Sequence, residues 1–154
     1  MSFERNLNTE TVDHCYPVEP LCLSRTASAA DALAEMQKRN CGAVLVCQDR
    51  AVIGIFTERD ALAMMAGGAD FDTPLERLMT ADPVVIRATD KVSTAITLMT
   101  RGGYRRIPII DDRGCAVGII TAEGIMHYLA EHFPSVIYNL PPEPHHATQA
   151  REGA

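Results

Sequence analysis

The sequence lacks the features that mark several common functional classes. No apolar run approaches the roughly 18 residues that a membrane-spanning helix needs, and the polar start "MSFERNLNTE" contains no apolar signal-peptide core. The five cysteines include no C-x-x-C pair, and the formal charge of −6 at pH 7 is accompanied by no basic stripe. We therefore expect a cytoplasmic protein without a membrane span, a metal site or a nucleic-acid partner.

Catalytic constellations are absent as well. The sequence shows no paired acids, no nucleophile placed with a base and no metal-binding triad. His127 and His132 fall in the same predicted helix, but at a spacing of five residues they do not share one face. We predict that the chain is not an enzyme; a small catalytic activity without such a constellation is the weaker alternative.

What the sequence does contain is a repeat of about sixty residues. "VEPLCLSRTASAADALAEMQKRNCGAVLVCQDRAVIGIFTERD" aligns with "ADPVVIRATDKVSTAITLMTRGGYRRIPIIDDRGCAVGIITAEG", so that Pro20 falls on Pro83 and Thr57 on Thr121. Upstream, "TVDHCYP" aligns with "PLERLMT". We assign 12–66 to the first repeat, 67–80 to a linker with a short helix, 75–133 to the second repeat, and 134–154 to a proline-rich tail that we expect to be flexible.

Each repeat has the pattern of a strand, a helix, a hairpin and a second helix. A short strand (21–23, 84–86) precedes a helix whose apolar residues recur every three or four positions. "RTAS" and "RATD" offer helix N-caps, Gly102–Gly103 offers a helix end, and "TPLE" predicts a linker helix capped by Thr73. The later helices are expected to bury Leu62 and Met65, or Ile125, Met126 and Leu129. The predicted fold class is α/β (α+β): two β-α-β-β-α units with pseudo-twofold symmetry and a cleft on each side of the axis.

Taken together, "GIFTERD", "GIITAEG", "YRRIPIIDD" and "LMTADPVVI" resemble the motifs of a tandem pair of cystathionine-β-synthase-type (CBS) domains, also called a Bateman module. The likeness covers roughly residues 10–135. It implies a non-catalytic regulatory module that binds an adenosine-containing ligand in a cleft between the repeats. AMP, ADP and ATP are the expected ligands, and NAD and S-adenosylmethionine are the alternatives. The resemblance also implies a homodimer, whereas the regulated protein partner is not identified.

The first motif places Thr57 and Asp60 at the predicted start of a helix. A carboxylate can accept hydrogen bonds from two adjacent ribose hydroxyls, and the helix dipole favours its ionised form there. The same spacing is that of a capping box, in which both side chains serve only the backbone N–H groups. In the second repeat Gly124 replaces the acid, which indicates that the fold does not require it and that the second cleft cannot bind ribose in this way.

The resemblance assigns the ligand phosphates to basic residues of the opposite repeat, just before its hairpin. This position holds Arg105 and Arg106 in the second repeat but Gly42–Ala43 in the first. Arginine presents a planar fork that suits a phosphate; the alternative is that both arginines are solvated or paired with Asp111–Asp112. One cleft thus has a ribose acceptor and phosphate donors, and the other, which we call the mirror cleft, has neither.

The resemblance assigns the adenine to apolar strand edges at Ile55, Val84 and Val85, although such residues are also ordinary core residues. The competing function is a scaffold, in which the CBS pair dimerises or docks a partner without a nucleotide. We expect no catalytic cofactor, and we expect His145 and His146 in the tail to be a solvated pair. The predicted nucleotide site consists of Thr57, Asp60, Arg105, Arg106, Ile55, Val84 and Val85.

Overall fold

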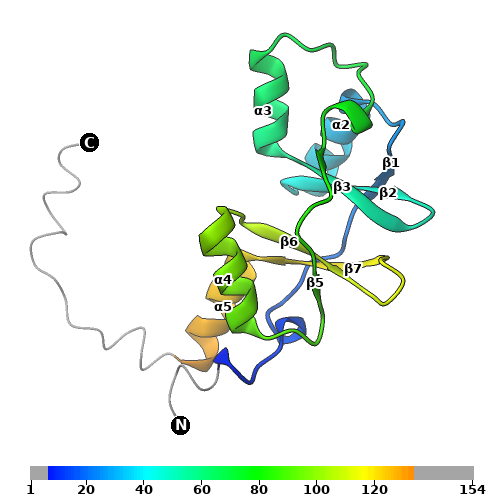
Figure 1. Cartoon of the computed structure of the whole chain (residues 1–154). Helices are drawn as coiled ribbons and strands as arrows, with labels where there is room; N and C mark the ends of the chain where they lie inside the picture. Colours follow the sequence, from blue (N-terminus) through cyan, green and yellow to red (C-terminus); the bar gives the residue numbers. More distant parts are fainter. Residues whose placement is uncertain (1–6, 134–154) are drawn as a thin grey trace, which may run out of the picture.

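Two small sheets, each built mainly from one repeat, lie at the centre of the molecule (Figure 1). The computed structural model describes residues 7–133. The first sheet contains β1 (Cys22–Ser24), β2 (Ala43–Gln48), β3 (Ala51–Thr57) and β4 (Thr80–Ala81), and the second contains β5 (Ile86–Arg87), β6 (Arg106–Ile110) and β7 (Ala116–Thr121). The helices are η1 (Val12–His14), α2 (Ala29–Arg39), α3 (Glu58–Ala66), η2 (Leu75–Arg77), α4 (Val92–Gly102) and α5 (Ala122–His132). This mixed architecture confirms the predicted fold class.

The two repeats use the same strand pairing. β1 runs parallel to β2 and β5 runs parallel to β6, while each hairpin is antiparallel. The first hairpin turns through Asp49 and Arg50, whose φ angles are 51° and 72°. Positive φ at both central residues gives a turn whose twist matches that of the strands. The second hairpin takes its left-handed residue at Gly114, with φ of 81°.

The helix caps agree with the sequence in some places and not in others. Ser28 caps α2 in a complete capping box with Asp31, and Gly103 ends α4 with φ of 72°. At the start of α4 the predicted cap from "RATD" is wrong: Lys91 is the N-cap and has no side-chain cap bond. Asp90 instead accepts the N–H of Arg87 at 2.9 Å and so closes the preceding turn. The linker helix also differs, because η2 is a 3-10 turn that begins after Pro74 rather than Thr73.

The buried face of α3 was predicted wrongly. Leu62 is 66% exposed and Met65 is also exposed, whereas Ala61 and Met64 are buried. The segment "ERDALAMMA" has apolar residues on several sides of the helix, and only the stripe with a spacing of three residues faces the sheet. In α5, Ile125 and Leu129 are buried as predicted, but Met126 is exposed.

The short segment that opens each repeat packs into the core of the other repeat. Val12 and Cys15 belong to the buried cluster of the second repeat, and Val12 N–H donates to the carbonyl oxygen of Asp90 at 2.9 Å. Leu75 belongs to the buried cluster of the first repeat, and its N–H donates to Ala27 at 2.8 Å. Figure 1 shows the chain passing between the two lobes twice, before β1 and before β5. The repeats are therefore interlocked.

A separate apolar cluster joins the two sheets. Its buried members are Ala43, Leu45 and Ile55 from the first repeat and Ile119 from the second, with Cys47, Val52 and Ala116 packed against them. Within residues 7–133, no helix is both long enough and apolar enough to span a bilayer. The proline-rich tail and its His145 and His146 lie outside the described residues.

Candidate functional site

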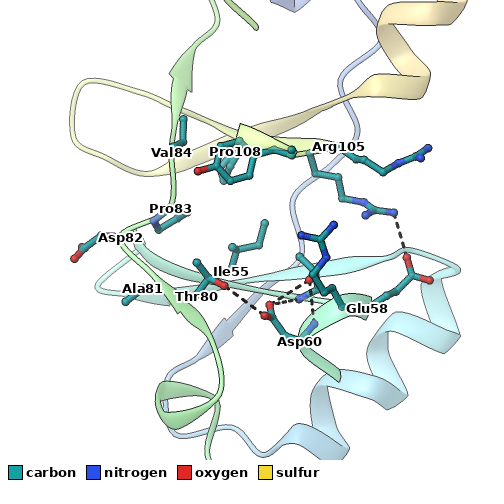
Figure 2. A pocket seen from close by; sticks show the side chains of 15 residues that line it. Ile55, Glu58, Asp60, Thr80, Ala81, Asp82, Pro83, Val84, Arg105 and Pro108 are labelled. Atoms are coloured by element: carbon teal, nitrogen blue, oxygen red, sulfur yellow. Dashed lines mark hydrogen bonds and ion pairs between the residues drawn. The ribbon is translucent and has the colours of Figure 1, made fainter. Parts of the chain in front are cut away.

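A cavity of about 480 Å³ opens between the repeats at the start of α3 (Figure 2). Its walls come from the end of β3, from β4 and the segment after it, and from the entrance to β6. The lining residues are Ile55, Thr57, Glu58, Arg59, Asp60, Thr80, Ala81, Asp82, Pro83, Val84, Gly103, Tyr104, Arg105, Arg106 and Pro108. The fold therefore brings six of the seven predicted site residues to one cavity, and Val85 does not line it.

Asp60 forms the capping box that was the alternative interpretation of its motif. Thr57 N–H donates to Oδ2 of Asp60 at 2.9 Å, and Asp60 N–H donates to Oγ1 of Thr57 at 3.3 Å. The hydroxyl of Thr57 also donates to the same Oδ2 at 3.2 Å. The carboxylate thus has a structural role at the start of α3, and one of its oxygens is committed to that role.

The second oxygen of Asp60 is less engaged. Its one described contact is a long hydrogen bond of 3.4 Å from the hydroxyl of Thr80, which reaches it from β4 (Figure 2). Thr80 lines the cavity beside Asp60 and was missed from the sequence, although its place in "LMTADPVVI" could have indicated it. Oδ1 of Asp60 is therefore the acceptor that remains for a hydroxyl donor inside the cavity.

Arg105 and Arg106 are paired, but not with the acids that the alternative named. Arg105 contacts Glu123 at 3.2 Å, and Arg106 contacts Glu58 at 3.3 Å across the gap between the repeats (Figure 2). Asp112 pairs instead with Arg87. The side chain of Arg106 is 24% exposed and that of Arg105 is 66% exposed, so Arg106 is the more enclosed of the two cations.

The carboxylate partner of Arg105 is held in its ionised form. The pKa of Glu123 is lowered first by a hydrogen bond from its own backbone N–H at the start of α5, and then by Arg105. Glu58 is the first residue of α3, where the helix dipole favours negative charge. Each arginine therefore has an acid at a helix start as its partner.

Two further cavity residues were missed from the sequence. Arg59, between Glu58 and Asp60, lines the cavity and makes no ion pair with any residue in the described range 7–133. Tyr104 packs its ring over Gly102, where an added Cβ would lie 2.1 Å from the ring. Both adjoin predicted site residues in "TERD" and "YRR", and that adjacency was the available signal.

The mirror cleft is filled by the chain itself at Gly124. A Cβ on Gly124 would lie 2.4 Å from the carbonyl oxygen of Cys15 and 3.3 Å from that of Tyr16. Tyr16 adopts a φ of 53°, and its hydroxyl donates to Glu131 on α5. The glycine thus has a steric cause, so its presence does not show that the fold can dispense with the acid at Asp60.

Gly42 also has a packing role. A Cβ on Gly42 would lie 2.2 Å from a terminal nitrogen of Arg106 and 2.4 Å from Oε1 of Glu58. The missing side chain leaves room for the Arg106–Glu58 ion pair to lie over the backbone. Neither Gly42 nor Ala43 can supply a cation to the mirror cleft.

The cavity holds hydrogen-bonding and charged groups but no recognisable catalytic set. Within residues 7–133, no group of three or more His, Cys, Asp or Glu side chains is arranged to hold a metal ion. The chemistry available is recognition: one carboxylate oxygen and a threonine hydroxyl on one wall, three arginines around the opening, and apolar side chains between them. Such a set can bind and orient a polar small molecule.

Several proteins of known sequence are similar to this chain. The chain is 32% identical over 117 residues to an uncharacterized 17.7 kDa protein of Acidianus ambivalens, covering 75% of this chain and 68% of the relative. It is 33% identical to an uncharacterized protein of Methanopyrus kandleri, covering 67% of this chain and 54% of that one. The match to the arabinose 5-phosphate isomerase GutQ of Escherichia coli is 29% identical and spans 64% of this chain but only 31% of the enzyme.

Solved structures share the fold at low sequence identity. A CBS domain protein of Pyrobaculum aerophilum complexed with AMP superposes with a TM-score of 0.71 at 22% identity, covering 79% of this chain and 99% of that one. The CBS domain pair of protein MJ0100, complexed with 5′-methylthioadenosine and S-adenosyl-L-methionine, gives a TM-score of 0.72 at 21% identity, covering 78% and 99%.

The CBS domain family model matches residues 15–67 and again residues 75–131. These two matches cover more than half of the chain and fall on the two interlocked units, which confirms the resemblance inferred from the repeated motifs. The chain belongs to the CBS domain family and carries two CBS domains in tandem.

Proposed function

We propose that this chain is a regulatory module that binds one adenosine-containing ligand in the cavity between its CBS domains. The observation that carries the proposal is the asymmetry between the two clefts. One cleft gathers Asp60, Thr80 and three arginines around a cavity of about 480 Å³, a volume within the ordinary range for small-molecule sites. The mirror cleft has a glycine against a backbone carbonyl where the acid would be.

The ribose is assigned to Asp60. Within residues 7–133 its Oδ1 accepts only the long bond from Thr80, so it can accept a ribose hydroxyl without breaking the capping box. A second hydroxyl can bind Oδ1 in place of the long Thr80 bond, because each carboxylate oxygen has two lone pairs and Thr57 already uses both on Oδ2. A hydrogen bond to a charged group contributes about 1.5–3 kcal/mol. Asp60 therefore serves the helix start and the ligand together.

The phosphate is assigned to Arg59, Arg105 and Arg106. Arg59 has no ion-pair partner in the described residues, so it can bind an anion without losing an existing contact. Arg106 must exchange Glu58 for the phosphate or hold both. Because a phosphate carries more negative charge than one carboxylate, the exchange favours the ligand. We expect Glu58 and the phosphate to compete for Arg106.

The adenine is assigned to the apolar part of the cavity. Ile55 and Val84 approach it from opposite walls, and Pro108 lies beside Val84 (Figure 2). Tyr104 adds a ring at the cavity edge on which a base can stack. Related CBS pairs hold AMP, 5′-methylthioadenosine or S-adenosyl-L-methionine, which supports the adenosine class of ligand. AMP, ADP and ATP fit the three arginines better than an uncharged nucleoside does.

Regulation follows from where the ligand would lie. Its ribose contact belongs to the first CBS domain, and most of its phosphate contacts belong to the second. A ligand shifts a conformational equilibrium only through its different affinities for the two states. A molecule that bridges both domains meets this condition, because any movement of one domain against the other changes its contacts.

The test is isothermal titration calorimetry of the full chain with AMP, ADP, ATP, adenosine, NAD and S-adenosylmethionine. We expect one nucleotide per chain. A thermal-shift experiment at 100 times the dissociation constant should show a stabilisation of about 2.7 kcal/mol. Two equivalent nucleotides per chain, or no heat with any of the six compounds, would contradict the proposal.

A scaffold without a nucleotide is the second candidate function. The observation that favours it is the apolar surface on the helices, where Leu62, Met65 and Met126 are all exposed. Exposed apolar side chains of this size on two helices are available to an interface with another protein chain. Replacing Asp60 or the three cavity arginines distinguishes the two functions. A scaffold would keep its assembly in these variants, whereas a nucleotide sensor would lose ligand binding.

A further inference from the structure

Three cysteines from both CBS domains gather beside the apolar cluster that joins the sheets. Cys22 lies on β1 and Cys47 on β2, and the parallel register pairs Cys22 with Leu45 and Ser24 with Cys47. Cys22 and Cys47 therefore project from the same face of the sheet, two positions apart on neighbouring strands. Cys115 comes from the second domain and bridges to Ala51 at the end of the first hairpin.

Two of these thiols are placed to affect each other's protonation, since they lie two positions apart on the same face of neighbouring strands. The S–H of Cys47 acts as the donor toward the sulfur of Cys22. This donor lowers the pKa of Cys22 to about 7, although partial burial acts in the opposite direction. The same interaction, together with burial, raises the pKa of Cys47. Cys22 is therefore partly ionised to the thiolate near pH 7, whereas the neighbouring Cys47 keeps its proton.

The thiol with the lowered pKa is also the more exposed of the two. Cys22 is exposed, while Cys47 is half-buried against the apolar cluster. Cys15 is a contrast within the same chain, because it is buried and desolvation raises its pKa to about 11. Cys41 is also separate, since its thiol contacts the carbonyl oxygen of Ala43 at 3.6 Å. Reactive cysteines are those with an accessible thiolate.

We propose that Cys22 and Cys47 form a redox modification site, in which Cys22 reacts with a hydroperoxide and Cys47 resolves the product. The Cys22 thiolate attacks the peroxide oxygen, the O–O bond breaks, and Cys22 becomes a sulfenic acid while the peroxide is reduced to hydroxide or alkoxide. The sulfur of Cys47 then attacks the Cys22 sulfur, and a disulfide forms with loss of water. Overall, two thiols and one hydrogen peroxide give one disulfide and two water molecules.

The location gives this reaction a structural effect. The disulfide would tie β1 to β2 at the edge of the cluster that contains Leu45 and Ile55. Ile55 also lines the inter-repeat cavity, so the cross-linked strands belong to the same packed unit as the ligand site. The redox site itself does not depend on the nucleotide, and its test needs no ligand.

The experiment treats the reduced full-length chain with increasing hydrogen peroxide and maps every cysteine by differential alkylation and mass spectrometry. We expect a Cys22–Cys47 cross-linked peptide to appear first, before oxidation at Cys15, Cys41 or Cys115. In Cys47→Ala, Cys22 should instead be trapped as a sulfenic acid by dimedone. In Cys22→Ala, Cys47 should remain open to alkylation at peroxide doses that oxidise it in the wild type.

A second measurement uses the pH dependence of alkylation by iodoacetamide. At pH 7 we expect Cys22 to react roughly fivefold faster than Cys41, since the pKa of Cys22 is lowered and its thiol is the more exposed. In Cys47→Ala the reaction of Cys22 should require a higher pH, because the hydrogen-bond donor is gone. Cys115→Ser and Cys41→Ser serve as controls and should leave the Cys22–Cys47 bond intact. A Cys47–Cys115 disulfide in its place, or equal reactivity of Cys22 and Cys41, would overturn the proposal.

Discussion

The position of a Cβ atom on Gly124 lies 2.4 Å from the carbonyl oxygen of Cys15. Real Cβ atoms do not approach a backbone oxygen so closely, so residue 124 can carry no side chain unless the segment that crosses between the repeats moves. That segment is fixed at its other end by Val12, which is fully buried in the second core. The mirror cleft is therefore closed by the interlocking of the chain, and not only by the loss of an acid.

Gly124→Ala should lower the stability of the protein. Within a helix this change normally stabilises by about 0.5–1 kcal/mol, but overpacking against Cys15 should cost about 1–3 kcal/mol and reverse the sign. Thermal or urea unfolding measures the difference. Gly67→Ala at the end of α3 is the control, because its added Cβ would lie 3.4 Å from the nearest atom and should leave stability unchanged or raised. If Gly124→Ala is as stable as the wild type, the close approach is not present in solution.

Asp60→Ala should abolish nucleotide binding and also destabilise α3. The structural part is the loss of a capping box, at about 0.5–2 kcal/mol. Asp31→Ala is the matched control, because Asp31 forms the same capping box with Ser28 at the start of α2 and does not line the cavity. Both variants should lose similar stability, and only Asp60→Ala should lose the heat of binding in calorimetry. Equal binding by the two variants would remove the ribose assignment.

Arg106→Ala should weaken AMP much more than adenosine, since only AMP carries the phosphate. The loss should shrink as salt rises, because exposed charge interactions are screened. Glu58→Gln should act in the opposite direction and tighten AMP, since it removes the competing carboxylate at 3.3 Å from Arg106. Arg87→Ala is the control, because Arg87 pairs with Asp112 and does not line the cavity. Calorimetry at two salt concentrations measures all four proteins. An equal loss of AMP and adenosine in Arg106→Ala would assign this residue to the fold alone.

The chain should form a dimer through the exposed apolar side chains of α3 and α5. Leu62→Glu and Met126→Glu should each shift the protein toward a monomer, because a charge cannot be buried there without a partner. Light scattering at micromolar concentration measures the mass. Val117→Glu is the control, because Val117 is an exposed apolar residue on β7 rather than on a helix. A wild-type chain that is monomeric under these conditions contradicts the prediction.

Asp111 should make the second hairpin sensitive to acid. Its pKa is lowered first by the backbone N–H of Cys115 and then by that of Arg113. A group whose folded pKa is depressed contributes stability above its unfolded pKa, and this contribution is lost as the pH falls through the folded pKa. The difference in melting temperature between wild type and Asp111→Ala should therefore be largest near pH 7 and shrink below about pH 4. A difference that is constant down to pH 3 would show that charge is not involved.

The parts of the fold that could be predicted are those whose sequence pattern occurs in both repeats. The hairpins and first helices follow from a local pattern, and two copies of each pattern support one another. The buried face of α3 could not be predicted, because Leu62, Met64 and Met65 are all apolar and only the sheet determines which one is covered. Helix propensity does not determine which of several apolar faces of a helix is buried. Packing against the sheet determines it.

The residues of the candidate site could be predicted from the sequence, but the residues that they contact could not. The family resemblance assigned Thr57, Asp60 and Arg106 to one cleft, and all three line the cavity. Their contacts depend on approaches between distant segments, such as Glu58 to Arg106 or Thr80 to Asp60, for which the chain carries no spacing signal. Gly124 shows the same limit, because a glycine opposite an aspartate suggests a lost function, whereas its cause is a backbone carbonyl more than a hundred residues earlier.

The interlocked opening segments have a consequence for how such a body can be assembled. η1 and η2 hold the same position in the repeat, and each fills the core of the other copy. In a chain with a single repeat, the opening 3-10 segment would have no second core to pack into. The core of that repeat would also lack the segment that covers it. Two such chains would satisfy each other by exchanging segments, and duplication within one chain turns that exchange into an internal contact. The present chain is thus folded like a domain-swapped pair whose two halves have been joined.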